Sequence, residues 1–390
     1  MDDALLDIQA KAARQQPEWG DPARVRQIRE TLAGREGLVA AEDVDTLRSL
    51  LARVADGEAL VVQSGDCAED PAECTPGYVA RKTAVLDLLV GVLKMITHKP
   101  VIRVGRMAGQ FGKPRSSPTE RVGGVELPAY RGHLVNGPEP DPESRRPDPQ
   151  RLLSCYRAAR EIMTHLGWGG TVRRHWTEPP VWTSHEALIL DYELPLVRRD
   201  ERGRLVLTST HWPWIGERTR QLDGAHVALL SRVANPVACK VGPKVTADEL
   251  LGLCERLDPR REKGRLTLIA RMGAAAVGDR LPKLVAAARE AGHPVIWLTD
   301  AMHGNTVTLP GGLKTRFVET IEREIQEFQE AVRSEGGIDG GLHLETTPDD
   351  VTECAPNDTC VDHVADKYTS YCDPRLNPRQ AVAVASVWLG

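Results

Sequence analysis

The segment that decides the fold runs from Val237 to Leu298 and reads VACKVGPKVTADELLGLCERLDPRREKGRLTLIARMGAAAVGDRLPKLVAAAREAGHPVIWL. It contains three short, unbroken apolar runs, separated by two longer stretches in which apolar residues recur every three or four positions. Unbroken runs are typical of strands buried on both faces, and the wider spacing is typical of amphipathic helices. Thr246 is the expected N-cap of the first helix. This order of strand, helix and strand predicts a parallel sheet covered by helices.

The same alternation continues in both directions along the chain. We expect strands at Ala59–Gln63, Pro100–Val104, Val181–Ser184, Trp212–Ile215, Val237–Val241, Leu266–Ala270, Val295–Leu298 and Gly341–Leu344. We expect helices at Val79–Ile96, Leu152–Leu166, Leu222–Arg232, Ala247–Leu257, Asp279–Ala291, Arg316–Arg333 and Pro378–Leu389. Eight such units predict an α/β protein with a (β/α)8 TIM barrel. The alternative, a doubly wound open sheet, normally has a GxGxxG turn after its first strand, and the nearest candidate, residues 105–112, lacks that spacing.

Two regions of the chain depart from the regular alternation of strands and helices. Residues 1–56 are polar and rich in arginine, with helical stretches at Asp7–Arg14 and Ala23–Leu32 that carry too little apolar surface for a core of their own. We therefore expect an N-terminal helical extension over residues 1–56 and one barrel domain over residues 57–390. Residues 115–180 are rich in proline, glycine and charge, which predicts loops around the single helix at Leu152–Leu166.

Composition narrows the class of protein. The 390 residues include 50 Lys and Arg against 55 Asp and Glu, a balance that argues against nucleic-acid binding. Of the basic residues 39 are arginine, which favours recognition of phosphate and carboxylate groups. The eight cysteines form no CxxC pair, and the chain shows neither a secretion signal at its start nor an apolar run of membrane-spanning length. We expect a cytoplasmic protein with no membrane segment.

Charged side chains follow most of the predicted strands, where barrel enzymes place their chemistry. In chain order these residues are Asp66 and Cys67, Arg106 with Lys113 and Arg115 close behind, Glu217 and Arg218, Lys240, Arg271, Asp300 and His303, and Glu345. A single arginine could equally form a surface salt bridge. Because Arg106, Arg218, Lys240 and Arg271 fall at the same end of different strands, we expect them to bind one or two phosphates and a carboxylate.

A second set of residues has the donor atoms of a metal site. Thiolate, imidazole and two carboxylates, from Cys67, His303, Glu345 and Asp373, suit one divalent transition metal, and Mn, Fe, Co and Zn all remain compatible. Each residue also has a plainer interpretation: a small buried thiol, a loop histidine, or a carboxylate paired with arginine. His343 shares a strand face with Glu345, which favours a partner of a ligand over a ligand.

Several motifs together resemble type II 3-deoxy-D-arabino-heptulosonate 7-phosphate (DAHP) synthase. The resemblance runs from about residue 16 to the C-terminus. Its motifs are Gln63–Glu69, Arg106–Ser116, Thr183–Leu188, Trp214–His226, Lys240–Pro243, Arg271–Gly273, Met302–Thr306 and Cys372–Asn377.

The resemblance implies an enzyme that condenses phosphoenolpyruvate with erythrose 4-phosphate, the first step of the shikimate pathway. It implies one divalent metal, manganese first, with Cys67, His303, Glu345 and Asp373 as ligands. Around phosphoenolpyruvate it implies Arg106, Glu217, Arg218, Lys240 and Arg271, and near the aldose phosphate Lys113, Arg115 and Ser116. Lys240, His303 and Arg271 are the expected catalytic residues. A homodimer or homotetramer is also implied.

Two departures from the family pattern stand out. The chain reads Thr299-Asp300-Ala301-Met302 where the family usually has Cys-Asp-Pro-Met. The segment between Leu166 and Val181 is short, whereas many members carry extra helices there that bind aromatic amino acids. The chain therefore resembles compact members of secondary-metabolite pathways, such as those to phenazines or aminoshikimate-derived products.

Two alternative functions and one regulatory hypothesis stay open. An amino-DAHP synthase would take an imino sugar phosphate in place of erythrose 4-phosphate, and a non-catalytic barrel would bind a partner protein. We also expect Cys67 and Cys372 to lie together beside the metal, so that a disulfide between them would remove a ligand.

Overall fold

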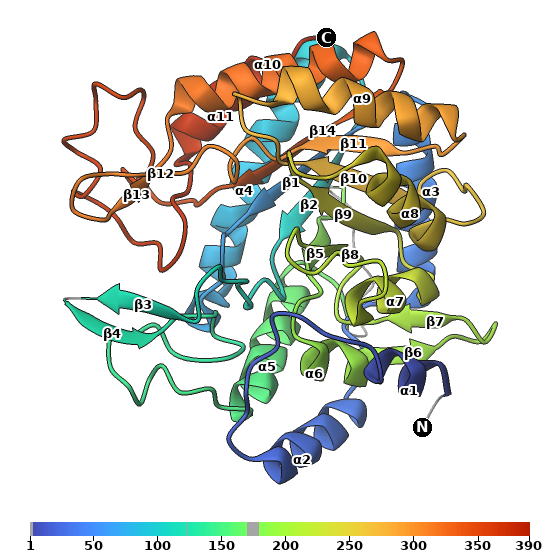
Figure 1. The fold of residues 1–390 in the computed structure, drawn as a ribbon, viewed down its shortest axis with the longest axis vertical. Helices are drawn as coiled ribbons and strands as arrows, with labels where there is room; N and C mark the ends of the chain where they lie inside the picture. Colours follow the sequence, from blue (N-terminus) through green and yellow to red (C-terminus); the bar gives the residue numbers. More distant parts are fainter. Residues whose placement is uncertain (1–2, 123, 170–178) are drawn as a thin grey trace.

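The barrel predicted from the sequence is confirmed. The computed structural model describes residues 3–122, 124–169 and 179–390. In this part of the chain, eight parallel strands follow one another around a closed barrel, and the last pairs with the first (Figure 1). They are β1 (Leu60–Gly65), β2 (Val101–Arg106), β5 (Trp182–Glu186), β8 (Trp212–Ile215), β9 (Val237–Val241), β10 (Leu266–Ala270), β11 (Ile296–Thr299) and β14 (Ile338–Glu345).

Helices surround the barrel as the apolar spacing predicts. They are α4 (Pro76–Thr97), α5 (Gln150–His165), α7 (Ala225–Arg232), α8 (Ala247–Leu257), α9 (Val277–Glu290), α10 (Val318–Ser334) and α11 (Pro378–Ser386), together with the short α6 (Leu190–Glu193). Thr246 caps α8 as expected, in a capping box with Glu249. Asn377 and Gln380 form the same motif at the start of α11. These caps fix where the chain leaves each rim loop and enters a helix.

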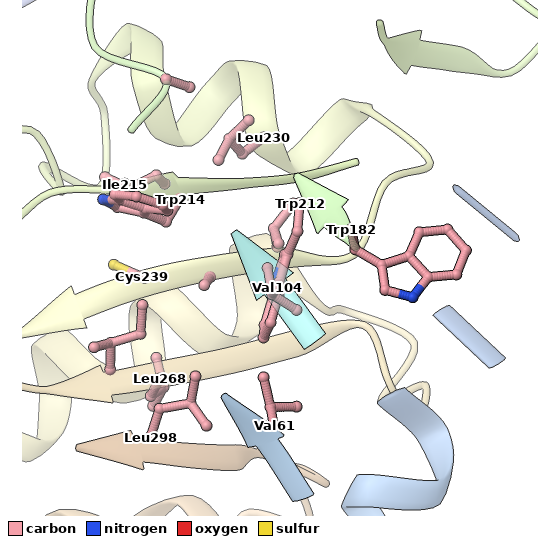
Figure 2. Packing of buried hydrophobic residues seen from close by; sticks show 14 of the residues in the cluster. Val61, Val104, Trp182, Trp212, Trp214, Ile215, Leu230, Cys239, Leu268 and Leu298 are labelled. Carbon is pink, nitrogen blue, oxygen red and sulfur yellow. The ribbon is translucent and has the colours of Figure 1, made fainter. Parts of the chain in front are cut away.

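Apolar side chains from the barrel strands form one buried core. Val61, Val104, Trp212, Leu268 and Leu298 come from five different barrel strands and are all fully buried. Figure 2 shows them gathered in one cluster. Close packing of this kind makes the barrel a rigid frame for the loops at its rim.

The N-terminal residues form three helices, of which the sequence predicted two. These are α1 (Asp3–Gln9), α2 (Pro22–Ala33) and α3 (Ala41–Ala55). The predicted helix at Asp7–Arg14 is wrong in its bounds, since α1 ends at Gln9. The backbone beyond it bonds to the barrel instead, through Ala225 N–H to Ala12 O (3.0 Å). Helix α3 was not expected from these polar residues, yet Val44, Leu47 and Leu51 form a fully buried stripe along it. The division at residue 56 stays a prediction.

Short hairpins decorate the barrel. The strands β3 (Thr119–Val122) and β4 (Val125–Pro128) form one, β6 (Val197–Arg199) and β7 (Leu205–Leu207) a second, and β12 (Val307–Thr308) and β13 (Lys314–Thr315) a third. Two short 3-10 turns, η1 (Pro71–Glu73) and η2 (Leu194–Leu196), complete the elements. Residues 170–178, in the short segment noted above, lie outside the described residues. Within the described residues, no helix is long and apolar enough to cross a bilayer.

Candidate active site

A cavity of about 310 Å³ opens at the carboxyl ends of the barrel strands. All the predicted site residues line it except Glu345, which lies fully buried at the end of β14. The other lining residues are Gln110, Pro114, Glu186, Trp214, Gly216, Thr306, Thr308 and Lys314. The fold therefore brings together residues that are up to 306 positions apart in the sequence, such as Cys67 and Asp373.

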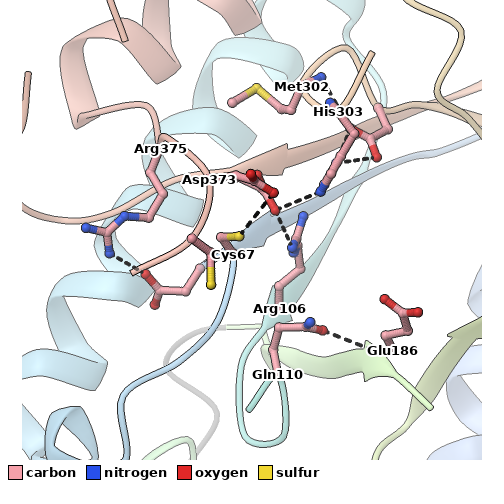
Figure 3. A network of polar contacts seen from close by, with 12 residues as sticks. Cys67, Arg106, Gln110, Glu186, Met302, His303, Asp373 and Arg375 are labelled. Atoms are coloured by element: carbon pink, nitrogen blue, oxygen red, sulfur yellow. Dashed lines mark hydrogen bonds and ion pairs between the residues drawn. The ribbon is translucent and has the colours of Figure 1, made fainter. Parts of the chain in front are cut away.

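Three of the four predicted metal ligands form one tight group. Cys67 follows β1, Glu345 ends β14 and Asp373 lies in the loop before α11, and one donor atom of each lies within 4.8 Å of the others. Figure 3 shows Cys67 and Asp373 facing one another, with Sγ and Oδ2 3.8 Å apart. The fourth, His303, is joined to the group through Nε2, which lies 3.1 Å from Glu345 Oε1.

The orientation of His303 suits a ligand. Asp300 accepts a hydrogen bond from the other ring nitrogen, Nδ1, which lies 2.8 and 2.9 Å from its two carboxylate oxygens. Burial lowers the pKa of His303, although Asp300 and Glu345 oppose the shift. A neutral ring that donates from Nδ1 keeps Nε2 free to bind a metal, the arrangement common around histidine ligands. The sulfur and two carboxylates of the tight group, with the His303 nitrogen beside Glu345, are therefore a donor set that fits a single divalent transition metal.

His343 contacts this group without joining it. Its Nδ1 lies 2.5 Å from Gln63 Oε1 and its Nε2 lies 3.0 Å from Arg106 Nη1. Burial, with the charges of Lys240 and Arg106, holds the pKa of His343 well below its ordinary value. The neutral ring thus accepts from Arg106 rather than from a predicted metal ligand, so the interpretation that it assists a ligand stays a prediction.

Cations balance the acidic group. Glu345 accepts from Arg106 Nη2 at 3.0 Å and from Arg316 Nη1 at 2.7 Å. Burial raises the pKa of Glu345, but the nearby His303 ring and the charges of Lys113 and Arg316 outweigh it and hold that pKa well below its ordinary range. The carboxylate is therefore ionised and available as a ligand.

Lys113 lies closer to the metal group than its predicted role near the aldose phosphate suggests. Its Nζ is 2.6 Å from Cys67 Sγ and 2.7 Å from Asp373 Oδ2. Burial and a hydrogen bond with Cys372 nevertheless raise the pKa of the Cys67 thiol. That hydrogen bond also places the two cysteines together, as the motifs implied.

The predicted anion-binding side chains face the same cavity. Lys240 donates to Asp300 Oδ2 at 2.7 Å, and Arg271 Nη2 donates to the carbonyl oxygen of His303 at 3.2 Å. Burial lowers the pKa of Lys240, with Asp300 acting against it. Trp214 presents its ring to both Arg106 (5.4 Å) and Lys240 (5.8 Å), which orients the two cations.

The remaining predicted residues lie nearer the opening. Arg218 and Ser116 are exposed at the rim. Arg115 pairs with Glu120, and its backbone N–H donates to Gln15 Oε1 at 2.9 Å. Glu217 accepts from Arg220 at 2.8 Å through one oxygen, and its other oxygen has no hydrogen-bond partner in the described ranges. These residues therefore border the solvent-exposed side of the cavity.

Sequence reasoning missed three residues that complete the site. Glu186 ends the third barrel strand, β5, and the strand-end argument applied to that strand would have found it. It is partly buried, and its Oε1 has no hydrogen-bond partner among the described residues. Lys314 lies in the hairpin of β12 and β13, and Arg316 follows it directly; no local sequence pattern predicted this hairpin. Lys314 donates to the free oxygen of Asp373, Oδ1, at 2.8 Å.

Two buried glutamates hold the rim loops through their backbones. Glu69 accepts from the N–H groups of residues 108, 109 and 110, at 2.8 to 3.1 Å, and so shapes the loop between Arg106 and Lys113. Glu353 accepts from the N–H groups of residues 369, 370 and 375, at 2.7 to 3.1 Å, on either side of Asp373. Charge-assisted hydrogen bonds of this kind preorganise both loops.

Comparison with known proteins agrees with this geometry. The model of the class-II DAHP synthetase family matches residues 4–168 and 159–388, nearly the whole chain. The chain belongs to this family. It is 58% identical over 389 residues to a probable phospho-2-dehydro-3-deoxyheptonate aldolase of Pseudomonas fluorescens, covering 100% of this chain and 97% of the relative.

Two actinobacterial relatives are more distant. The phospho-2-dehydro-3-deoxyheptonate aldolase of Streptomyces coelicolor is 41% identical over 421 residues, covering 96% of this chain and 94% of that protein. The enzyme of Mycolicibacterium smegmatis is 37% identical over 429 residues, covering 96% and 92%. These matches confirm the resemblance to the DAHP synthase family that the sequence motifs indicated.

Proposed function

We propose that this protein condenses phosphoenolpyruvate with erythrose 4-phosphate to give DAHP and inorganic phosphate. The observation that carries the proposal is that one cavity combines two groups of side chains. One group, around Cys67 and Glu345, has the donors for a divalent metal, and the other, around Arg106 and Lys240, has the cations for two anionic substrates. Membership of the DAHP synthase family supports the same reaction.

Cys67, His303, Glu345 and Asp373 would hold the metal, with manganese the first choice and cobalt, iron or zinc as alternatives. A divalent ion bound there supplies Lewis-acid polarisation of the aldehyde carbonyl. The ligands come from four different segments, so the metal site depends on the closed barrel and on the loops that Glu353 and Asp300 position.

The cationic side chains bind and orient phosphoenolpyruvate. Arg106, Lys240 and Arg271 face the cavity, with Arg218 at the rim, and together they offset the charge of its phosphate and carboxylate. Lys113, Arg115 and Ser116 bind the aldose phosphate from the other side. Held this way, the enol C3 of one substrate lies against the aldehyde carbon of the other, which removes much of the association entropy from the barrier.

The bond changes follow from that placement. C3 attacks the aldehyde carbon, a water adds to C2, and the phosphate leaves with cleavage of the bond between C2 and oxygen. Of the two residues expected to donate a proton to the new alkoxide, Lys240 is the better placed, because its ammonium faces the cavity and is held by Asp300 Oδ2 at 2.7 Å. The ring proton of His303 is instead directed at Asp300. The water that adds to C2 releases a proton, which restores the charge of Lys240. Glu217, with one unpartnered carboxylate oxygen, is placed to contact phosphoenolpyruvate.

The pathway and the second substrate are finer proposals. The short segment between Leu166 and Val181 supports a compact enzyme that feeds a secondary-metabolite route. The rim residues also suit an imino analogue of erythrose 4-phosphate, which would make the protein an amino-DAHP synthase.

The test is turnover by the purified, metal-loaded protein. On incubation with phosphoenolpyruvate, erythrose 4-phosphate and Mn²⁺, the absorbance of phosphoenolpyruvate is expected to fall and phosphate to be released. Excess chelator is expected to stop the reaction. A parallel reaction with the imino analogue identifies the preferred acceptor. If phosphoenolpyruvate is consumed with neither of the two acceptors, the partner-binding barrel becomes the better interpretation.

A further inference from the structure

Two loops of the cavity, which carry Arg271 and His303, touch backbone to backbone. Gly273 follows β10 and Gly304 follows β11, and a Cβ added to Gly304 would lie 2.4 Å from the nitrogen of Gly273. Gly273 also has a φ of +81°, which side chains other than glycine rarely tolerate. No side chain separates the two loops at Gly273 and Gly304. The polar contacts around these two glycines therefore hold the loops in their relative position.

Those contacts converge on a buried residue of α10. Glu324 is 1% exposed, and its Oε1 accepts from Gly273 N–H at 2.8 Å while its Oε2 accepts from Asn305 Nδ2 at 2.5 Å. Asn305 in turn accepts from Ala274 N–H at 3.0 Å and donates to Ala301 O at 2.8 Å. These partners determine which way the Asn305 amide points, so its nitrogen faces Glu324.

We propose that Glu324 is a positioning residue that holds the Arg271 loop and the His303 loop together by accepting one hydrogen bond from each. Both of its partners are donors, so the position requires two acceptors. A carboxylate supplies them, whereas glutamine supplies one acceptor and one amino group that would face the amino group of Asn305.

Glu324 therefore connects the phosphoenolpyruvate side of the site, through the Arg271 loop, with the metal side, through the His303 loop. Arg271 is two residues from Gly273, and its guanidinium already donates to the carbonyl oxygen of His303 at 3.2 Å. His303 is two residues from Asn305 and carries a predicted metal ligand atom. Loosening Glu324 therefore moves a phosphoenolpyruvate cation and a metal ligand together, and leaves Lys113, Arg115 and Ser116 on other elements in place. This inference rests on the proposed function for the identity of the ligands.

The experiment compares Glu324→Gln and Glu324→Asp with wild type, using titration calorimetry of Mn²⁺ and of phosphoenolpyruvate without the second substrate. Both variants are expected to bind Mn²⁺ about tenfold more weakly, as for other residues that orient metal ligands, and to bind phosphoenolpyruvate more weakly as well. Aspartate keeps the carboxyl group but is one methylene too short to reach both donors. Glu330→Gln, on the exposed side of the same helix, is the matched control.

Steady-state kinetics separates positioning from a general structural role. The KM for phosphoenolpyruvate is expected to rise while the KM for the aldose phosphate stays within about twofold of wild type. Asn305→Ala combined with Glu324→Gln is expected to cost less than the sum of the two single changes, because both remove the same contact between Asn305 and Glu324.

The inference is overturned if folded Glu324→Gln protein binds Mn²⁺ and phosphoenolpyruvate like wild type, or if both substrates weaken equally along with a lower Tm. A wild-type protein that binds neither Mn²⁺ nor phosphoenolpyruvate would overturn the proposed function as well. Binding without turnover would refute the reaction and leave the proposed role of Glu324 standing.

Discussion

Asp300→Asn should weaken metal binding without touching a predicted ligand atom. Asp300 is fully buried, and its carboxylate holds His303 Nδ1 at 2.8 to 2.9 Å, Lys240 Nζ at 2.7 Å, and the backbone N–H groups of Met302 and His303. Asparagine has nearly the same shape but offers one acceptor and no charge. Its amino group must therefore face a donor, either the imidazole or the ammonium.

The expected size follows from these contacts. Loss of a carboxylate that orients a histidine ligand typically costs 10- to 100-fold in metal affinity, or about 1.4 to 2.7 kcal/mol. The buried Lys240 ammonium also loses its anionic partner, and breaking a buried pair costs about 3 to 5 kcal/mol of unfolding free energy. Because Asp300 also orients Lys240, affinity for phosphoenolpyruvate should fall together with affinity for the metal.

The assay is titration of chelator-stripped protein with Mn²⁺, followed by phosphoenolpyruvate. Asp362→Asn, an exposed aspartate in the loop before α11, is the control and should match wild type. A folded Asp300→Asn protein with a Mn²⁺ Kd within twofold of wild type would refute the argument that Asp300 orients His303.

Other consequences can be tested in the same protein. Cys67→Ser, Arg271→Ala and His303→Ala should each lose about 10²- to 10³-fold or more in kcat with little change in circular dichroism; wild-type-like turnover in any one would remove that residue from the mechanism. Mild oxidation should join Cys67 to Cys372, whose thiols are hydrogen-bonded, with loss of bound metal that dithiothreitol reverses; peptide maps without that cross-link would end the idea. Burial lowers the pKa of His133 to about 4, so between pH 6.5 and 4 the unfolded chain binds a proton that the folded protein does not. Wild type should lose up to about 3 kcal/mol of unfolding free energy across this window, relative to His133→Gln, and urea titrations that show parallel losses would contradict this.

The barrel was predictable because each of its parts carries a local signal. The strands between Ala59 and Leu344 are short, mostly apolar runs, and the start of α8 is marked by its N-cap Thr246. Helix α3 escaped notice because its buried stripe is diluted by charged residues, so that only the barrel it packs against makes it a helix. The end of α1 is likewise set by a tertiary contact, between Ala12 and Ala225.

The site was predictable where it coincides with strand ends or with family motifs, and unpredictable where distant elements supply it. Cys67 and Glu345 end neighbouring barrel strands, which pair in register at Gly65 and Glu345. Arg316 and Glu324 instead reach the site from the hairpin and helix that follow β11. Their contacts depend on how α10 packs, which a single sequence does not express.

The most direct test of the account is anomalous diffraction from crystals of the Mn²⁺-loaded protein. We expect one ion bound by Cys67 Sγ, His303 Nε2 and the carboxylates of Glu345 and Asp373, about 2.0 to 2.4 Å from each donor atom, with Lys113 Nζ moved away from the sulfur. An anomalous peak elsewhere, or none at this group in protein that is catalytically active, would contradict it.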